Sequence, residues 1–349
     1  MKTRLPNLDI IRSCAIVFVI CCHSILNFDF VGSHLDGIEH FLMLAFWIFV
    51  HSCVPLFLML SGYLMNSKKL SAKYYIESTK LVIPYIIISL ICLAFKVVYC
   101  HEGIGLRYIV GSIVNFYACE YAWYLMMYLG LYFMIPFLNL IYHGLETQKQ
   151  KIILISVFFA LSHLASFLNS YIQLYSVWWK NIYPITFYFV GVYLSEFKPR
   201  KNAGFYLISA FILTLVFSLF DIFHMGKNGS WVVSIYYDHY QLFIISVLLF
   251  CGINSIKTGR IPGAIIKCAS KVSLLSFYIF LLSGITDIFV FDQLEKFVPN
   301  FQSEYLLSLL AAAASFILAL VLSAAIYPAC EKFSAATVKK LLSLDKVAQ

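Results

Sequence analysis

The stretch RLPNLDIIRSCAIVFVICCHS, residues 4–24, decides how this chain folds. It is apolar enough to enter a membrane, yet it carries Asp9, Arg12 and His23. On an α-helix, Arg12 and His23 differ by only about 20° around the axis and lie roughly 16 Å apart along it. Asp9, three residues before Arg12, can pair with it on the same face. Ionisable groups in hydrocarbon are costly unless they face protein or water, so this aligned trio predicts a functional site.

Each residue of the trio also has a plainer explanation. Arg12 can extend its guanidinium to the membrane surface, and His23 can be a hydrogen-bonded histidine in a polar bundle core. For either residue alone, that explanation is the better one. Three costly groups on one helix face favour function instead.

The composition is that of a membrane protein. Of the 349 residues, 62% are hydrophobic and only 12% are charged, with a mean hydropathy of +0.86. Soluble proteins have about 25% charged residues. The basic N-terminus precedes an apolar run that Arg12 interrupts, without a clear cleavage site, which favours a retained first helix over a signal peptide. The net charge of +8 is a topology signal and does not indicate a nucleic-acid partner.

Apolar runs long enough to span a bilayer predict a single all-α domain over residues 1–349, a bundle of about ten transmembrane helices. The expected spans are 8–26, 41–64, 81–100, 123–142, 152–168, 179–197, 204–224, 237–255, 272–291 and 305–327. Of the 25 Lys and Arg residues, 19 fall at the termini and in alternate connections. Only Arg107, Lys180, Lys227 and Lys296 fall in the opposite set. The positive-inside rule therefore predicts that both termini are cytoplasmic.

This orientation sets the depth of the second span. It places His51 near the middle of the membrane and a turn at Ser61–Tyr63 at the cytoplasmic end. The basic segment NSKKLSAKYYIESTK, residues 66–80, is amphipathic and is expected along the inner surface.

Acidic and aromatic residues concentrate towards the outer side. Asp221 and Asp287 fall in the outer halves of the seventh and ninth spans, and Glu120 precedes the fourth. Any of the three can orient or charge-balance His23, and the sequence does not choose among them. The outer connection HMGKNGSWVVSIYYDH, residues 224–239, offers aromatic rings, including Trp231, of the kind that stack on sugars.

Other motifs limit the possible chemistry. Most of the ten cysteines lie in apolar spans, where Cys behaves as a small hydrophobe. Cys100 and Cys119 flank one outer connection and are candidates for a disulfide in an oxidising compartment. No Cys/His group has the spacing of a zinc site, so no metal is expected. The chain has no nucleotide-binding glycine loop and no GxSxG motif.

Four segments resemble one known family. LDIIRSCAIVFVICCHS resembles the first helix of the integral-membrane acyltransferase 3 family, in which an Arg and a His stand eleven residues apart. VPLFLMLSGYLM, AWYLMMYLGLYFMIPFLN and IYPITFYFVGVYLSE are similar to later helices of the family and follow in the same order. The resemblance runs from about residue 4 to residue 328.

The resemblance implies a multi-pass enzyme of the inner (cytoplasmic) membrane. Such proteins transfer an acetyl or other short acyl group from a cytoplasmic acyl-CoA donor to a sugar hydroxyl of an envelope glycan or a lipid-linked sugar. It assigns His23 to catalysis. It assigns donor or substrate binding to Arg12, Asp9, Lys80, Tyr63 and Trp123.

Two positions depart from the family pattern. Lys80 stands where members often have Arg, which keeps the charge and loses bidentate phosphate geometry. Ser283 stands where many members have a second His. The alternative function is a transporter that exports a glycan or its lipid-linked precursor, because polar residues at the midplane serve that task as well. The lack of visible inverted repeats favours the enzyme.

Overall fold

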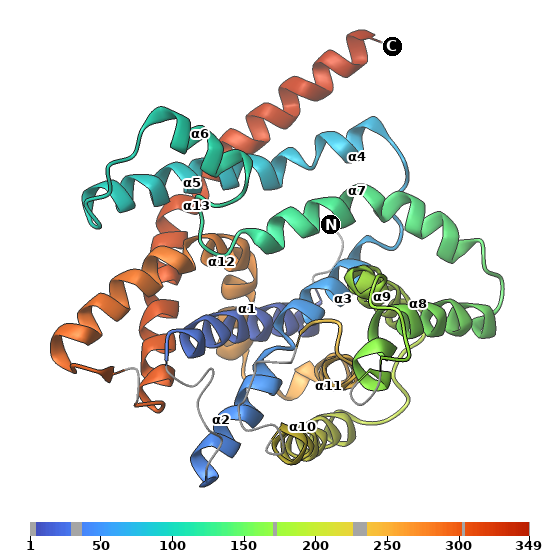
Figure 1. Cartoon of the computed structure of the whole chain (residues 1–349). Helices are drawn as coiled ribbons and strands as arrows, with labels where there is room; N and C mark the ends of the chain where they lie inside the picture. Colours follow the sequence, from blue (N-terminus) through green and yellow to red (C-terminus); the bar gives the residue numbers. More distant parts are fainter. Residues whose placement is uncertain (1–4, 29–36, 170–172, 226–235, 302–303, 349) are drawn as a thin grey trace. The chain divides into compact units, whose positions relative to one another are not determined.

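The structure, a computed structural model, describes residues 5–28, 37–169, 173–225, 236–301 and 304–348. In these ranges the chain forms helices and no strands, which confirms the predicted all-α class (Figure 1). Lys2, Arg4, Lys227 and Trp231, used in the sequence analysis, lie outside the described residues. The helices are α1 (Pro6–Leu26), α2 (Gly37–Val50), α3 (Cys53–Met65), α4 (Ala72–Ile76), α5 (Thr79–Val98), α6 (Leu106–Val114), α7 (Trp123–His143), α8 (Gln148–Leu168), α9 (Tyr183–Glu196), α10 (Ala203–Met225), α11 (Tyr240–Asn254), α12 (Gly263–Phe297) and α13 (Leu307–Ala348).

Eight helical segments within the described ranges are long and apolar enough to cross a membrane. They are α1, α2 with α3, α4 with α5, α7, α8, α10, α12 and α13. All eight overlap predicted spans. The protein therefore has the helices of a multi-pass membrane protein.

The other two predicted spans contain the shorter helices α9 and α11. With 14 and 15 residues, they measure roughly 21 and 22 Å, less than the roughly 30 Å of a hydrocarbon core. Most of their side chains are buried against other helices. A helix surrounded by protein does not need to match the bilayer thickness. The ten-span topology and the cytoplasmic termini stay predictions.

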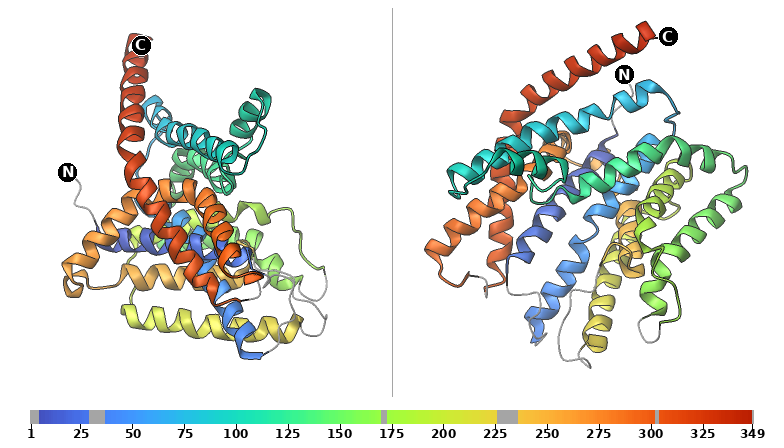
Figure 2. Two further views of the ribbon diagram at one scale, coloured as in Figure 1. Left: turned by 90° about the vertical axis from the view of Figure 1, so that its left-hand side faces the viewer. Right: turned by 45° about the horizontal axis from the view of Figure 1, so that its top comes forward.

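The chain divides into two compact units. The first comprises residues 1–67, 141–273 and 300–309, and the second comprises residues 68–140, 274–299 and 310–349. In the first unit, α10 and α11 pack side by side (Figure 2). The first unit also contains α1, so it holds Asp9, Arg12 and His23.

Helices α3 and α9 make the closest backbone approach in the first unit (Figure 1). A Cβ atom at Gly62 would lie 2.0 Å from the carbonyl oxygen of Tyr188, and one at Gly191 would lie 2.0 Å from that of Met59. The two glycines thus let the helix backbones touch. The expected turn at 61–63 is wrong, because α3 continues to Met65 and needs Gly62 for this contact.

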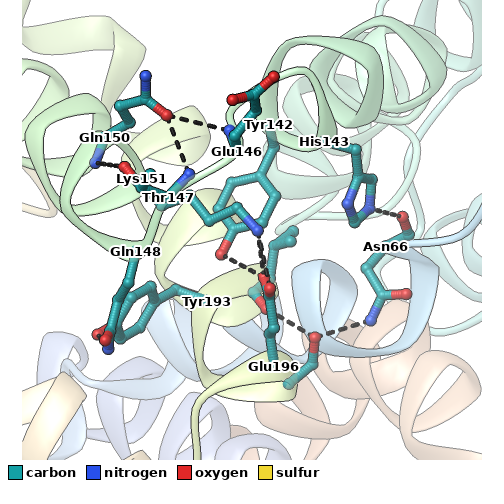
Figure 3. Close-up of polar contacts among 12 residues, drawn as sticks. Asn66, Tyr142, His143, Glu146, Thr147, Gln148, Gln150, Lys151, Tyr193 and Glu196 are labelled. Carbon is teal, nitrogen blue, oxygen red and sulfur yellow. Dashed lines mark hydrogen bonds and ion pairs between the residues drawn. The ribbon is translucent and has the colours of Figure 1, made fainter.

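Polar side chains tie the ends of four helices of the first unit together (Figure 3). Lys151 of α8 is buried, and its Nζ lies 2.8 Å from both carboxylate oxygens of Glu196 in α9. Tyr142, near the end of α7, donates a hydrogen bond of 3.2 Å to the same carboxylate. His143 Nε2 lies 2.8 Å from the carbonyl oxygen of Asn66, which follows α3. Lys151, one of the basic residues of the topology count, is therefore also a buried partner in an ion pair with the partly exposed Glu196.

The second unit contains α4, α5, α6 and most of α7 and α13. The rings of Tyr74 and Tyr132 stack at 4.6 Å, and each hydroxyl donates to the other residue's carbonyl oxygen, at 2.6 and 3.1 Å. The amphipathic segment predicted at 66–80 is partly helical as α4 and packs on α7 through this pair.

The disulfide candidate Cys100–Cys119 is not formed, since both cysteines are free thiols. The sulfur of Cys119 lies 3.8 Å from that of Cys92 instead. Cys92 is on the buried face of α5, whereas Cys100 lies beyond the end of that helix. The turn of α5 thus determines which cysteine meets Cys119.

The α3–α9 contact can be tested by adding one methyl group. Gly191→Ala places a Cβ against a backbone oxygen that cannot move away cheaply, so we expect a loss of about 1–3 kcal/mol and a lower Tm in detergent. Gly130→Ala is the matched control, because a Cβ there meets nothing within 4 Å. Because alanine has a higher helix propensity than glycine, the Gly130→Ala variant should have a Tm equal to or slightly above that of the wild type. An unchanged Tm in Gly191→Ala would show that the helices are not in backbone contact.

Candidate functional site

The first helix is continuous from Asp9 to His23. Pro6 occupies the first turn of α1, where its missing N–H is not needed. Asp9 also lies in the first turn, where the helix dipole favours a negative charge. The helix ends at Leu26, and the next residue, Asn27, donates a hydrogen bond of 2.8 Å from its Nδ2 to the carbonyl oxygen of His23. Arg12 and His23 therefore have the spacing along one helix that the sequence analysis assumed.

At the start of α1, a serine pair from α12 holds the acidic side chain. Asp9 is buried and accepts hydrogen bonds from Ser270 Oγ at 2.8 Å and Ser273 Oγ at 2.7 Å. Nη1 of Arg12 lies 3.5 Å from the same Ser273 hydroxyl. Ser13 Oγ donates 2.7 Å to the carbonyl oxygen of Ala269. The Ser273 hydroxyl thus links the carboxylate to the guanidinium, and α12 fixes both.

At the other end of α1, the described residues place a second histidine, His51, against the part of the helix that carries His23. Cys22, next to His23 in the chain, brings its sulfur 3.6 Å from Nδ1 of His51. From the sequence, His51 had a predicted depth in the membrane and no predicted role. In the structure it lies at the site.

His51 lies at a break in its transmembrane segment. Residues 51 and 52 separate α2 from α3. Pro55 lacks an N–H, so the chain cannot form the helical hydrogen bond to the carbonyl oxygen of His51. That carbonyl instead has the sulfur of Cys53 at 3.8 Å. The proline four residues later was the sequence signal for this break.

Tyr237, in the described residues just before α11, contacts His51. The ring of Tyr237 stacks on that of His51 at 5.7 Å, and the ring of Tyr183 is 5.9 Å from Tyr237. Part of the predicted aromatic connection is therefore beside His51.

Each of the three candidate acid partners of His23 has a partner of its own. Asp221 accepts 2.9 Å from Gln241, Glu120 forms an ion pair of 3.2 Å with Lys96, and Asp287 accepts from Ser315 and, at 3.0 Å, from Tyr121. Glu120 and Asp287 belong to the second unit. The choice of an acid partner for His23 stays a prediction.

The remaining predicted binding residues lie on three different helices. Tyr63 of α3 has its ring 6.0 Å from that of Phe250 in α11. Trp123 begins α7 and is exposed. Lys80, near the start of α5, lines a groove with Lys339 and Ser343 of α13. Ser283 is buried and bonds the carbonyl oxygen of Phe280 within its own helix.

Among the described residues, no three His, Cys, Asp or Glu side chains gather as a metal site requires. The site chemistry that these residues offer is ionic and proton-transferring. It consists of a held guanidinium at one end of α1 and two imidazoles at the other.

The helices and these ionisable groups define a multi-pass membrane protein with a polar site on its first helix. Residues 5–328 match the model of the acyltransferase 3 family, described as an acyltransferase domain. The match covers nearly the whole chain, so the protein belongs to this family and is a membrane acyltransferase. The family requires an acyl donor and an acceptor. The searches of curated proteins and of solved structures found no match.

The link through Ser273 is directly testable. Ser273→Ala removes one of the two hydroxyls that bond buried Asp9 and the one next to Arg12, so we expect a loss of about 1–3 kcal/mol. The measurement is the Tm of the purified protein in detergent. Ser255→Ala is the matched control, since within the described part of the chain that hydroxyl bonds the carbonyl oxygen of Cys251 one turn earlier. Equal Tm values for the two variants would contradict the role of Ser273.

Proposed function

We propose that this protein moves an acetyl or other short acyl group from cytoplasmic acyl-CoA to a sugar hydroxyl of an envelope or exported glycan. It would do so in the inner membrane. One observation carries the proposal. A single continuous helix holds Arg12 near one end and His23 near the other, on nearly the same face. The two steps of acyl transfer, holding an anionic donor and removing a proton from an acceptor, need these two groups.

The Arg12 end suits the donor. Coenzyme A carries phosphates, and a guanidinium binds phosphate through two parallel hydrogen bonds. Arg12 is half-buried, and its Nη1 is next to Ser273, which Asp9 also holds. The guanidinium is thus positioned before the donor arrives. Positioning in advance lowers the cost of binding, because less side-chain freedom is lost.

The His23 end suits the acceptor. Along α1, His23 is roughly 16 Å from Arg12, a gap that the extended pantetheine arm of coenzyme A can cross. An imidazole of near-neutral intrinsic pKa is an efficient general base for a hydroxyl. The nearby rings of Tyr237 and Tyr183 offer the apolar faces on which sugars stack.

The reaction then needs no further reagent. The sugar oxygen bonds to the thioester carbonyl carbon as His23 takes the hydroxyl proton. The carbon–sulfur bond breaks with its electron pair going to sulfur, and the thiolate receives the proton. In this proposal Lys80 attracts the donor's phosphates as a point charge. Asp9 orients Arg12, and Tyr63 and Trp123 contact substrate.

Two variants separate the two ends of the site. The assay uses purified protein in detergent, radiolabelled acetyl-CoA and chemically deacylated envelope glycan. Arg12→Ala should weaken acetyl-CoA binding at least about tenfold, since a hydrogen bond to a charged group is worth about 1.5–3 kcal/mol. Arg12→Lys should recover only part of it. His23→Gln should bind acetyl-CoA normally and transfer acyl groups at least about 10²-fold more slowly.

Lys149→Ala, which removes an exposed positive charge outside the site, is the control for Arg12. Wild-type transfer in His23→Gln would make His23 a structural histidine. A wild-type protein that moves glycan across a membrane without acylating it would establish the transporter instead.

A further inference from the structure

The geometry points to His51 as the second proton-handling residue of this acyltransferase, acting with His23 as a pair that holds one proton. The inference rests on the proposed function, because it names how the same site handles the hydroxyl proton. It also supplies a second histidine, which the sequence lacks at position 283. Ser283 stands where the resemblance leads one to expect a second histidine, and His51 comes to the site from a different helix.

His51 lies close to the end of α1 that carries His23. His51 is buried at 8% exposure, at the break between α2 and α3. Cys22 Sγ lies 3.6 Å from its Nδ1, which puts the last turn of α1 against the break. His23 is the next residue after Cys22 in α1. Two histidines from separate helical segments thus lie at the same end of α1.

A backbone contact selects the tautomer of His51. Nδ1 of His51 lies 3.1 Å from the carbonyl oxygen of Trp47. A carbonyl oxygen can only accept a hydrogen bond, so Nδ1 carries the hydrogen. In a neutral imidazole the other nitrogen, Nε2, then carries the lone pair. A backbone carbonyl that fixes Nδ1–H in this way prepares Nε2 to receive a proton.

Two aromatic side chains contact the imidazole ring of His51. His51 is packed between the indole of Trp47, whose centroid is 4.0 Å away, and the ring of Tyr237 at 5.7 Å. The ring is therefore held in one orientation. Tyr237 lies at the end of the site that the proposed function gives to the acceptor. An acceptor hydroxyl bound at this end would arrive beside His51.

The pair gives a balanced proton path. As the sugar oxygen bonds to the acyl carbon, its proton passes to one of the two imidazoles. The other imidazole stays neutral, because two like charges in one buried site repel. When the carbon–sulfur bond breaks, the thiolate takes the proton back from the pair. No net proton is consumed, and no other acid is required.

A structural role for His51 makes a different prediction. If the ring serves only to bond Trp47 at the helix break, any side chain with a donor at the Nδ1 position replaces it. Asn has such a donor and lacks a nitrogen at the Nε2 position. His51→Asn therefore keeps the bond to Trp47 and removes the proton acceptor, which separates the two roles.

The experiment measures kcat, KM and acetyl-CoA binding for full-length His51→Asn and His51→Gln in the transfer assay above. We expect both variants to bind acetyl-CoA normally, with kcat lower by at least about 10²-fold. His163→Asn is the matched control. His163 is also fully buried, with Nδ1 2.6 Å from Ser162 Oγ, and its replacement should leave kcat unchanged. The double variant His23→Gln/His51→Asn should be no slower than the slower single variant, because residues that act as a unit are not additive.

Several results would overturn the inference while leaving the proposed function intact. Wild-type kcat in His51→Asn would make His51 a structural residue, and multiplying effects in the double variant would mean that the histidines act separately. If both His51 variants fail to reach the membrane, the test is chemical labelling of the wild-type protein.

Deacylated glycan should shield His51 from carbethoxylation by diethyl pyrocarbonate, and equal labelling of His51 with and without glycan would overturn the inference. Failure of wild-type transfer, or wild-type transfer by His23→Gln, would count against the proposed function itself.

Discussion

The buried carboxylate of Asp9 sets the arrangement of the whole site. A charge inside a membrane protein needs partners from the protein itself, since lipid offers none. Ser270 and Ser273 of α12 supply two hydroxyl donors, and Ser273 is also within 3.5 Å of the Arg12 guanidinium. This requirement fixes α1 against the first part of α12. Because α1 is continuous, fixing its first turns also fixes where His23 lies in its last turn.

The other end of α1 depends on a second backbone constraint. Pro55 removes one helical hydrogen bond and leaves a break at residues 51 and 52. After the break, α3 packs backbone to backbone against α9 through Gly62 and Gly191. This packing holds α3 against α9. His51, at the break, has its Nδ1 3.6 Å from the sulfur of Cys22 in α1.

Much of this could be predicted from the sequence because hydropathy and helical periodicity are local. The predicted spans, the face shared by Arg12 and His23 and the family resemblance all follow from residues a few positions apart. The prediction failed where a distant contact decides. The turn predicted at 61–63 was wrong, because α3 continues through Gly62 and packs its backbone against α9 at this residue. The sequence left open whether Cys100 and Cys119 are bonded, and in the structure α5 presents Cys92 to Cys119 instead. His51 was missed because its neighbours come from α1 and from the connection before α11, which no local pattern reveals.

The central claim is that one helix joins a donor site at its cytoplasmic end to an acceptor site nearer the outer face. The most direct measurement uses sealed proteoliposomes with deacylated glycan trapped inside and radiolabelled acetyl-CoA added only outside. The account predicts label covalently attached to the trapped glycan, with coenzyme A released outside. Label that appears only when donor and acceptor share one side of the membrane would contradict it.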